Sequence, residues 1–378
     1  MNGLARDRLA VAVDATPLLG ARTGIGAFTA ALLEHLAHRR EVQVTAYGLT
    51  WRGRQSLATA VPAGVRTTRR PMAARPLRVA WQRGNRPPIE WWTGPVDVVH
   101  GTNFVVPPTA GAARVVTVHD LTPVHYPELC DAATLAFPSL VRRAIARGAW
   151  VHTHSRFVAD EIVRHLGAPA ERVVVVPAGV PAVPPADPAL GRRLAGAERY
   201  LLALGTVEPR KDLPLLVRAF DAVAGTRPDV RLVIAGPDGW DAGSLRQAMA
   251  GADHRDRIVR LGWVDHEARA GLLRGAAAVA YPSRYEGFGF PPLEAMAAGV
   301  PVVATTAGSL PEVLGDAATL VPVGDLDALA EALAALLDDP GGGADRVAAG
   351  RRRAATYRWE NTAAGMVELY RQAADGRW

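Results

Sequence analysis

Two glutamates, Glu286 and Glu294, stand at the two ends of a glycine- and proline-rich stretch of the chain. The stretch follows the apolar run 276–280, and we expect it to begin a helix with Pro291 or Pro292 at the first position, where a missing N–H costs nothing. A turn from a strand into a helix offers unpaired backbone N–H groups to an anion. Carboxylates repel phosphate but accept hydrogen bonds from hydroxyls. This combination predicts a site for a sugar nucleotide. A structural interpretation competes with it, because a glutamate in a first helical turn is favourable against the helix dipole without any ligand.

The chain contains a single lysine. Of its 43 basic residues, all but Lys211 are arginine. Where composition favours arginine so strongly, a retained lysine suggests that a compact point charge is needed. Lys211 follows Arg210 in the segment 205–211, directly after the apolar run 200–204. Both side chains are of types that neutralise phosphate, so this segment is a second candidate for phosphate contacts.

The elements that must position these residues alternate between apolar runs and helical patterns, which indicates parallel α/β architecture. In the first half we expect strands at 10–13, 42–47, 96–100, 115–118, 150–153 and 173–176, and helices at 26–37, 132–147 and 156–166, the last capped by Ser155. In the second half we expect strands at 200–204, 232–235, 258–261, 276–280 and 301–304, and helices after Asp212, Ser244, Asp265, Pro291 and Asp325. Ser309 and Glu312 fit a capping box.

Five prolines within residues 177–188 form a stiff connector and mark a domain boundary. A chain of 378 residues is too long for one ordinary core. We therefore expect two Rossmann-like domains, over residues 1–180 and 199–355. The tail 361–374 has the pattern of an amphipathic helix, which must dock on another element.

Ligands of open α/β sheets bind beyond the carboxyl ends of the strands. The loops that carry candidate residues all follow predicted strands: 20–26, His119 with Asp120, 205–211, 236–239, 262–264 and 286–289. Two doubly wound domains facing one another would enclose a single cleft lined by these loops.

Composition limits the class of protein. An apolar content of 49% and a charged content of 21% are typical of a soluble globular chain. No run approaches the ~18 apolar residues of a membrane span. Asp14 interrupts the first apolar run too early for a signal peptide. The only cysteine, Cys130, excludes an internal disulfide and cysteine-based zinc sites, and it suits a reducing cytoplasm.

The first half carries the excess of positive charge. Nine arginines and no acidic residue lie between Glu41 and Glu90. Four tryptophans lie in or beside this stretch: Trp51, Trp81, Trp91 and Trp92. Arginine with tryptophan favours peripheral contact with an anionic membrane, and a solvated basic face is the competing interpretation. No nucleic-acid-binding motif accompanies the charge, so we expect no nucleic-acid partner.

The segment 281–312 resembles the E-x7-E signature and downstream loop of the retaining glycosyltransferase family 4. Segment 205–213 is similar to the phosphate-contacting segment of that family, and 151–157, 176–180 and 359–363 are similar to weaker family patterns. Ala178 and Phe290 depart from the common residues, Asn and Leu. The resemblance covers nearly the whole chain. It implies the GT-B fold, which has two doubly wound Rossmann-like domains facing a central cleft. The N-terminal domain would bind the acceptor and the C-terminal domain the donor, and a C-terminal helix, 359–378, would close back onto the first domain.

The resemblance also implies residue roles. Arg210 and Lys211 would neutralise the donor diphosphate, Glu286 would accept from the sugar hydroxyls, and His119 would lie near the transferred sugar. Donor binding would further involve Gly24, Gly26, Thr206, Gly236, Trp263, Val264, Gly287, Phe288, Gly289 and Glu294. Among these, Glu294 would hold the ribose, and the backbone of Trp263 and Val264 would contact the base.

The implied activity is transfer of a hexose from a nucleoside-diphosphate sugar, with GDP or UDP as carrier, to a glycan or a lipid-linked acceptor. Configuration would be retained, and neither a metal nor another cofactor would be needed. Segment 118–128 is similar to mannosyl- and rhamnosyltransferases of envelope polysaccharide assembly, which favours GDP-mannose.

Other interpretations stay open. A sugar-nucleotide 2-epimerase has a similar fold, a phosphorylase would use Lys211 to bind pyridoxal phosphate, and a scaffold subunit would not catalyse at all. Asp325 and Asp327 have a metal-binding spacing, but a helix start explains them. His152 and His154 lack a third metal ligand, and Gly24-Ile-Gly26 lacks the third glycine of a dinucleotide fingerprint.

Overall fold

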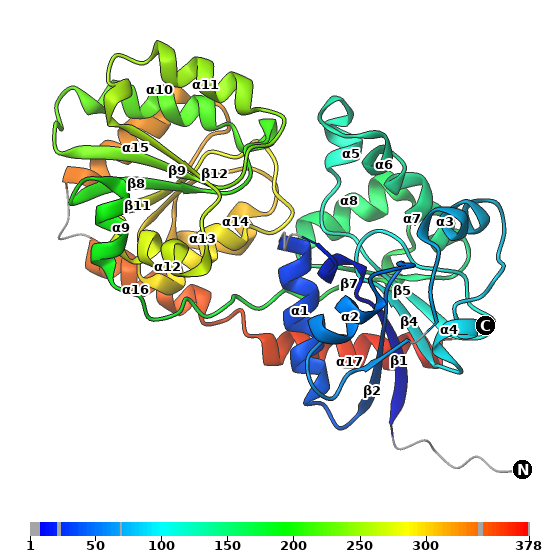
Figure 1. Cartoon of the computed structure of the whole chain (residues 1–378). Coiled ribbons are helices and arrows are strands. Elements are labelled where there is room, and N and C mark those ends of the chain that lie inside the picture. The colour runs from blue at the N-terminus through cyan, green and yellow to red at the C-terminus, as the bar shows by residue number, and fades with distance from the viewer. Residues whose placement is uncertain (1–7, 21–23, 69, 339–342, 377–378) are drawn as a thin grey trace, which may run out of the picture. The chain divides into compact units, whose positions relative to one another are not determined.

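The computed structural model describes residues 8–20, 24–68, 70–338 and 343–376, and the chain forms two compact units (Figure 1). The first unit comprises Met1–Gly179 together with Arg358–Trp378, and the second comprises Val180–Tyr357. Each unit holds one parallel sheet with helices on both faces (Figure 1). The prediction of two doubly wound Rossmann-like folds is confirmed.

The first sheet has seven parallel strands in the order β3-β2-β1-β4-β5-β6-β7. The strands are β1 Leu9–Asp14, β2 Val42–Tyr47, β3 Arg66–Thr67, β4 Val98–Gly101, β5 Ala113–Thr117, β6 Trp150–Thr153 and β7 Val173–Val175. The helices of this unit are α1 Gly24–Ala37, α2 Arg54–Ala60, α3 Ala74–Arg83, α4 Glu90–Thr93, α5 Thr122–His125, α6 Ala132–Leu135, α7 Phe137–Ala146, α8 Arg156–Leu166 and α17 Trp359–Asp375.

The second sheet has six strands in the order β10-β9-β8-β11-β12-β13. The strands are β8 Arg199–Leu204, β9 Val230–Ala235, β10 Ile258–Gly262, β11 Ala278–Tyr281, β12 Val302–Thr305 and β13 Thr319–Val321. The helices are α9 Pro188–Ala195, α10 Leu213–Ala224, α11 Ala242–Gly251, α12 His266–Gly275, α13 Phe290–Ala298, α14 Leu310–Leu314, α15 Leu326–Asp338 and α16 Gly343–Ala354.

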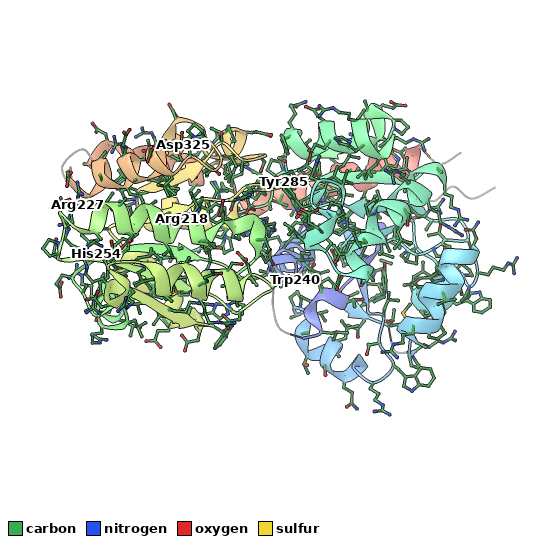
Figure 2. The ribbon with its side chains drawn as sticks, turned by 90° about the horizontal axis from the view of Figure 1, so that it is seen from above. Arg218, Arg227, Trp240, His254, Tyr285 and Asp325 are labelled. Carbon is green, nitrogen blue, oxygen red and sulfur yellow. The ribbon has the colours of Figure 1, made fainter. Side chains whose placement is uncertain are left out.

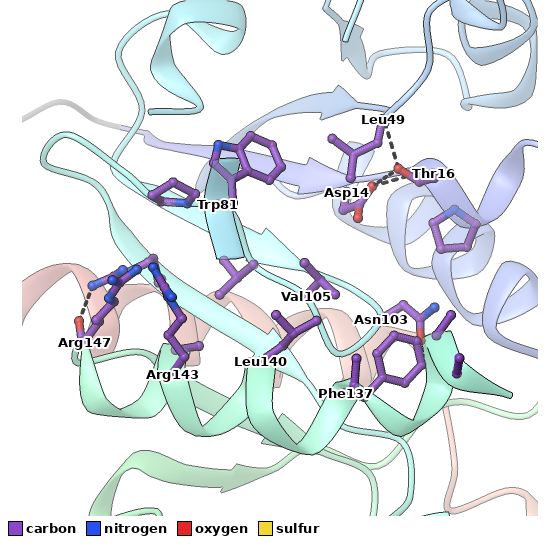
Figure 3. Close-up of a pocket in the computed structure, with 18 residues that line it drawn as sticks. Asp14, Thr16, Leu49, Trp81, Asn103, Val105, Phe137, Leu140, Arg143 and Arg147 are labelled. Atoms are coloured by element: carbon purple, nitrogen blue, oxygen red, sulfur yellow. Dashed lines mark hydrogen bonds between the residues drawn. The ribbon is translucent and has the colours of Figure 1, made fainter. Parts of the chain in front are cut away.

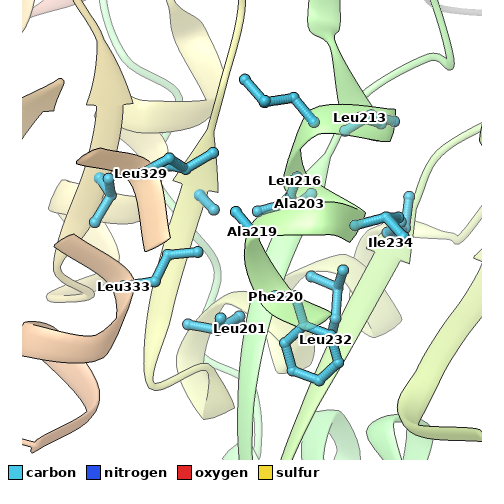
Figure 4. Close-up of a cluster of buried hydrophobic side chains, with 14 of the residues drawn as sticks. Leu201, Ala203, Leu213, Leu216, Ala219, Phe220, Leu232, Ile234, Leu329 and Leu333 are labelled. Atoms are coloured by element: carbon cyan, nitrogen blue, oxygen red, sulfur yellow. The ribbon is translucent and has the colours of Figure 1, made fainter. Parts of the chain in front are cut away.

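The core of the second unit includes a layer in which α10 packs on β9, and α15 packs on α10, β11, β12 and β13 (Figure 4). Leu216 and Phe220 of α10 are fully buried, as is Leu333 of α15. They meet strand residues such as Leu201 and Leu232, whose side chains face the helices. Each such burial removes apolar surface from water and contributes about 2 kcal/mol. Strands β8 and β11 are the two middle strands of the sheet.

Several sequence predictions about helix ends need correction. The expected helix 132–147 is two helices, α6 and α7, because Pro138 has no N–H for a continuous helix and fits only a first turn. The helix expected after Ser244 begins earlier, at Ala242. In α13, Phe290 takes the first position and Pro291 the second. The short strands β3 and β13 were missed, since two or three residues give no readable periodicity.

The predicted caps can be checked against the hydrogen bonds. Ser155 and Asp265 accept from the backbone N–H groups of Val158 and Ala268, as expected of helix caps. Asp325 accepts from Ala328 N at 3.0 Å, so its role at the start of α15 is capping (Figure 2). The capping box at Ser309 is wrong, because the Ser309 hydroxyl donates to the carbonyl oxygen of Glu286 instead.

The C-terminal helix α17 belongs to the first unit, where it lies against α1 and contacts β1, β4 and β5. Its inner face is apolar, with Met366, Leu369 and Tyr370 buried. Gly179, the last residue before the second unit, lies directly against Trp359, and a Cβ at Gly179 would fall 2.5 Å from the Trp359 ring. Among the described residues, no helix is both long and apolar enough to cross a bilayer.

A directed hydrogen-bond chain links α17 to the first sheet. The Val176 carbonyl can only accept, so Nε2 of His152 carries the hydrogen that binds it at 3.0 Å, and Nδ1 of His152 accepts from the Thr117 hydroxyl. The Thr117 oxygen in turn accepts from Nε2 of His100, at 2.7 Å. Nδ1 of His100 then accepts from the hydroxyl of Tyr370, at 2.8 Å. Both histidines are fully buried, and burial lowers the pKa of each, which keeps the rings neutral.

Candidate active site

The candidate site of the second unit lies where the strand order of its sheet reverses. Strands β8 and β11 are neighbours there, and the connections that leave them run to opposite sides. The loop after β8 carries Arg210 and Lys211, and the loop after β11 carries Glu286. Such a reversal is where open α/β sheets bind ligands, so the two segments singled out from the sequence meet at the expected place.

Glu286 is the centre of this arrangement. Its side chain is buried, with 6% of the residue exposed. Three donors converge on Oε1: the Ser283 hydroxyl at 2.9 Å, Nη1 of Arg210 at 2.9 Å, and Nζ of Lys211. Arg210 also forms an ion pair with Glu208, at 2.9 Å from its Nε. The carboxylate is therefore held in one orientation by charge-assisted contacts.

Lys211 is as deeply placed as its partner, with 8% of the residue exposed. Its Nζ donates to the Tyr281 hydroxyl and lies 4.4 Å from the centre of the Tyr281 ring. Tyr281 is the last residue of β11, and a cavity of about 10 Å³ adjoins both side chains. Tyr281 and Ser283 lie in the segment 281–312 that resembles the family signature, and no local pattern predicts their contacts to Lys211 and Glu286.

The charges of this cluster shift its proton affinities. Burial alone would raise the pKa of Glu286, but the positive charges of Lys211 and Arg210 override it and lower that pKa to about 2. Burial, helped by repulsion from Arg210, lowers the pKa of Lys211 to about 8, although the Glu286 charge opposes the shift. Near pH 7 the carboxylate is ionised and the amine protonated. The Lys211 amine loses its charge as the pH rises through its pKa of about 8.

Glycines allow the loops to approach one another closely. Gly236 has a φ of +144°, and a Cβ there would fall 2.0 Å from the carbonyl oxygen of Gly205. Gly308 has a φ of +57°, and a Cβ there would fall 2.3 Å from the carbonyl oxygen of Glu286. Ser309 N and the Ser309 hydroxyl also bind that oxygen, at 3.0 and 3.1 Å. The backbone of Glu286 is thus fixed from the loop that follows β12.

Residues 287–289 connect Glu286 to α13. All three are buried, and the Phe288 ring packs edge-on against Phe290. Gly289 has a φ of +101° at the N-terminus of α13, a backbone conformation that favours glycine. The predicted strand-to-helix turn is therefore present, with Gly287, Phe288 and Gly289 beside Glu286.

The other donor-site candidates of the second unit lie on neighbouring loops. Thr206 follows β8 next to Gly205, and Trp263 follows β10, with 73% of the residue exposed. Val264 is half-buried. Glu294 lies on α13, where its Oε2 forms an ion pair with Arg269 of α12. That ion pair gives Glu294 a structural partner that the sequence analysis did not anticipate.

In the first unit, Gly24 and Gly26 form the first turn of α1, which starts two residues earlier than predicted. Part of the predicted loop, residues 21–23, lies outside the described residues.

His119 follows β5, and both of its ring nitrogens are engaged: Nε2 with the Thr102 carbonyl at 2.8 Å, and Nδ1 with Nε2 of His154 at 3.0 Å. Burial lowers its pKa, so the ring is neutral. Asp120 accepts from Thr122 N, at 2.9 Å.

Among the described residues, one group of side chains is close enough to hold a metal ion. It consists of His125 of α5 with Glu161 and His165 of α8, whose ligand atoms lie within 4.8 Å of one another. Glu161 and His165 are four residues apart on one helix face, a spacing visible in the sequence but not weighed there. A contact of 2.6 Å between Nε2 of His125 and Oε1 of Glu161 accounts for the arrangement without an ion.

Comparisons with known proteins agree with this fold and show the family of the chain. Residues 22–182 match the family described as Glycosyltransferase Family 4, and residues 198–339 match the description Glycosyl transferases group 1. The chain is 32% identical over 282 residues to the O-antigen chain mannosyltransferase B of Escherichia coli, covering 72% of this chain and 74% of that protein.

Two solved structures are similar over nearly their whole length. Sucrose-phosphate synthase from Thermosynechococcus elongatus has a TM-score of 0.75 at 21% identity, with 97% of this chain and 99% of that one covered. Alr3699/HepE of Anabaena, in complex with UDP-glucose, has a TM-score of 0.68 at 18% identity, with 97% and 99% covered.

The two Rossmann-like folds, with their parallel sheets, have the architecture of the GT-B fold. Together with the sequence match to the mannosyltransferase, they show that the chain belongs to glycosyltransferase family 4. The resemblance drawn from the signature residues is confirmed, and the chain is an enzyme that transfers sugars.

Proposed function

We propose that the chain transfers a hexose from a nucleoside-diphosphate sugar to a glycan or lipid-linked acceptor, with retention of configuration. The cluster of Lys211, Arg210 and Glu286 at the strand-order reversal supports this proposal most directly. The second unit binds the donor, and the first unit binds the acceptor. A charged pocket of this composition suits a diphosphate joined to a hydroxyl-rich sugar.

Chemistry at this site follows from charge. As the glycosidic bond breaks, positive charge develops on the sugar and negative charge grows on the departing diphosphate. Lys211 and Arg210 are held in place before the reaction, so they stabilise the diphosphate without reorganisation. Glu286 accepts from sugar hydroxyls, and the backbone N–H groups of residues 287–289 assist at the phosphates. The cations supply the charge that a metal would otherwise provide, so transfer proceeds in the presence of a chelator.

The remaining candidates take supporting roles in this proposal. Gly24 and Gly26 let the first turn of α1 approach the phosphates, and Glu294 accepts from the ribose while Arg269 positions it. Trp263 and Val264 contact the base through their backbone, and Thr206 and Gly236 line the donor site. Because both nitrogens of His119 are engaged, we assign it the role of a neutral ring that shapes the sugar site, rather than that of an acid or base.

Mannose from GDP-mannose is our preferred donor, since the E. coli relative at 32% identity is named a mannosyltransferase of O-antigen chains. UDP is the competing carrier, since the similar Anabaena structure holds UDP-glucose. Thermal-shift measurements with GDP-, UDP- and dTDP-sugars separate these carriers, because a ligand that binds only the folded state raises the melting temperature. A stabilisation by UDP-sugars alone would reverse the assignment.

Two variants test the catalytic assignment. Lys211→Ala and Glu286→Ala should each lose most transfer activity while the protein stays folded. Near-wild-type turnover in either variant contradicts the proposal.

Incubation with donor alone tests the alternative of a 2-epimerase, which would change the donor sugar without any acceptor. A folded wild-type protein that binds donor but never transfers would instead support the scaffold alternative.

We also propose that the arginine-rich stretch before Glu90 contacts an anionic membrane surface from the cytoplasmic side. Trp51 and Trp91 support this, since 60% of each residue is exposed. Trp81 does not, because it is buried in the core of the first unit. The Trp51→Ser, Trp91→Ser double variant should lose flotation with anionic vesicles. Equal flotation of the wild type with neutral and anionic vesicles overturns this proposal.

A further inference from the structure

The first unit contains a cavity of about 350 Å³ that the proposed donor site does not use (Figure 3). It lies between α7, the loop that follows β4, and the residues that follow β1. Strands β1 and β4 are neighbours at the point where the order of the first sheet reverses. This cavity therefore occupies, in the first sheet, the position where an α/β fold binds a ligand.

The two ends of the cavity differ in chemistry (Figure 3). Asp14, Thr16 and Asn103 line one end, at the carboxyl ends of β1 and β4. Arg143 in the last turn of α7 and Arg147 directly after that helix lie at the other end, and Arg114 joins them. The distance from Phe137 to Arg147 along α7 is about 15 Å by helical rise. The cavity thus runs from a hydrogen-bonding end to a cationic end.

The wall between these ends is apolar. Its lining includes Trp81, Val105, Val106, Pro108, Phe137 and Leu140. The Trp81 indole N–H already donates to the Pro87 carbonyl, at 2.9 Å, so the ring presents an apolar face. Leu140 and Phe137 are only partly buried although both are large and apolar. An apolar ligand would cover them.

The loop that forms one side of the cavity has an uncommon backbone. Phe104 has a φ of +57°, which is rare for a residue other than glycine, and its ring stacks on Phe137 with centroids 4.7 Å apart. Gly101 permits the loop to fold back, because a Cβ there would fall 1.9 Å from the Val105 carbonyl oxygen. Strained backbone of this kind persists where the surroundings determine it, and it is frequent at ligand sites.

The cationic end holds more positive than negative charge. Arg114 donates to the Arg147 carbonyl, which links these two residues, and Arg143 donates to the Gly84 carbonyl at 3.1 Å. Burial and repulsion from Arg147 lower the pKa of Arg114, and burial and repulsion from Arg143 lower that of Arg147. Glu90 is the opposing charge near Arg114, and its Oε1 accepts from the backbone N–H groups of residues 110–112. An anion bound here would relieve the repulsion.

We propose that this cavity binds the acceptor, and that the acceptor is an anionic amphiphile. Its apolar body, about 15 Å long, lies along Trp81, Phe137 and Leu140. A carboxylate or phosphate at one end binds to Arg143 and Arg147. A hydroxyl-bearing end lies at Asp14 and Asn103, where it faces the carboxyl edge of the sheet. This inference rests on the proposed function, and it replaces a general glycan or lipid acceptor with a defined chemical class.

Calorimetric titration of the full chain without donor tests the proposal. The probes are 12-hydroxydodecanoate, dodecyl phosphate, the neutral 1,12-dodecanediol, and hexanoate. We expect the two long anions to bind, and the diol and the short acid to bind at least about tenfold more weakly. A preference between carboxylate and phosphate identifies the anionic group. Equal binding of 12-hydroxydodecanoate and the diol, or no binding of either long anion at about 1 mM, overturns the proposal.

Variants on one helix provide the matched control. Arg143→Ala and Arg147→Ala should each weaken binding of 12-hydroxydodecanoate about tenfold or more, whereas Arg142→Ala should not. Arg142 is an exposed residue of the same helix that donates to the His165 carbonyl instead. Leu140→Trp should block all long probes by filling the cavity. If any of these variants fails to fold, Arg147→Gln repeats the test with less change in volume.

Measuring donor binding as well as probe binding shows which of two claims fails: the acceptor class inferred here, or the transferase function proposed above. The stabilisation by nucleotide sugars depends on Lys211 in the second unit, so Arg143→Ala should leave it unchanged. Wild-type protein that binds donor but shows no difference among the four probes refutes the acceptor class and leaves the transferase proposal intact. Loss of donor binding in Arg143→Ala contradicts the separate location of the two sites.

Discussion

The hydroxyl of Tyr370 donates to Nδ1 of His100 over 2.8 Å, between residues 270 positions apart in the chain. Tyr370 is on the C-terminal helix, and His100 is on β4 of the first sheet. Both side chains are fully buried. This bond is the first link of the chain that passes through Thr117 and His152 to the Val176 carbonyl. The last helix is therefore joined to its sheet by polar as well as apolar contacts.

Removing this hydroxyl should destabilise the first unit. In Tyr370→Phe, Nδ1 of His100 stays buried without its donor, which costs about 1–3 kcal/mol. Urea denaturation measures the loss as a lower midpoint with an unchanged slope. Tyr357→Phe is the comparison, because the Tyr357 hydroxyl donates to the Val313 carbonyl at 3.1 Å from a half-buried position. If the Tyr370→Phe protein is no less stable than the Tyr357→Phe protein, the bond between Tyr370 and His100 does not stabilise the first unit as proposed.

The buried histidines should make the protein sensitive to acid. Burial lowers the pKa of His152 from 6.5 to about 4 in the folded state. The unfolded chain therefore binds a proton that the folded chain rejects, so stability is complete above about pH 6.5 and is lost as pH falls toward 4. For His152 alone the loss amounts to about 3 kcal/mol at most.

Two measurements check this acid sensitivity. The free energy of unfolding should fall between about pH 7 and pH 5, and the fall should be smaller in His152→Gln. The His152 ring signal in NMR spectra of the folded protein should stay that of a neutral imidazole over the same range. A ring that titrates near its ordinary value would refute the assignment.

Activity should depend on pH through Lys211. The pKa of this lysine in the free enzyme is lowered to about 8, and only the protonated amine attracts the donor diphosphate. With donor limiting, the rate should be constant below pH 8 and fall about tenfold per pH unit above it. At saturating donor the fall should begin at higher pH, because the bound diphosphate stabilises the protonated amine.

Lys211→Arg is the matched variant for this profile. Arginine keeps its charge, so any activity that remains should lose the fall above pH 8. An unchanged profile in Lys211→Arg would assign the titration to another group.

The position of the Glu286 backbone should depend on the absence of a side chain at Gly308. A Cβ at position 308 would meet the Glu286 carbonyl oxygen at 2.3 Å, and the φ of +57° disfavours a side chain. Gly308→Ala should therefore displace Glu286 and reduce kcat by about tenfold or more. Gly243→Ala is the control, since a Cβ there meets nothing within 4 Å and alanine suits a helix. Equal activity of both variants contradicts this role for Gly308.

The sequence predicted most strands well, because buried strands leave a local signal. Runs such as 42–47 and 150–153 coincide with β2 and β6, and the proline-rich connector contains the boundary at Gly179. Glu286 and Lys211 could be singled out because each follows a buried strand. The hydrogen-bond partners of the side chains were not predictable from the sequence. Ser309 has the spacing of a helix cap, yet tertiary packing turns its hydroxyl toward the carbonyl oxygen of Glu286.

Long-range side-chain contacts explain the other omissions. The link between His100 and Tyr370 depends on where α17 docks, and no local pattern encodes it. The cavity of the first unit brings together residues from β1, α3, the loop after β4, and α7. Each of these residues looks like ordinary core or surface in the sequence, and only the sheet order places them around one space.

Because the chain has a single lysine, it offers one side-chain amine for chemical labelling. Lys211 carries the only ε-amine of the chain, and its pKa of about 8 makes the reactive neutral form accessible under mild conditions. An amine-selective acylating reagent small enough to reach the buried Lys211 would thus modify one side chain, besides the terminal amine, and mass spectrometry of the product would report on a single position. Protection of that position by a nucleotide sugar would count occupied molecules directly, without a radioactive donor or an identified acceptor.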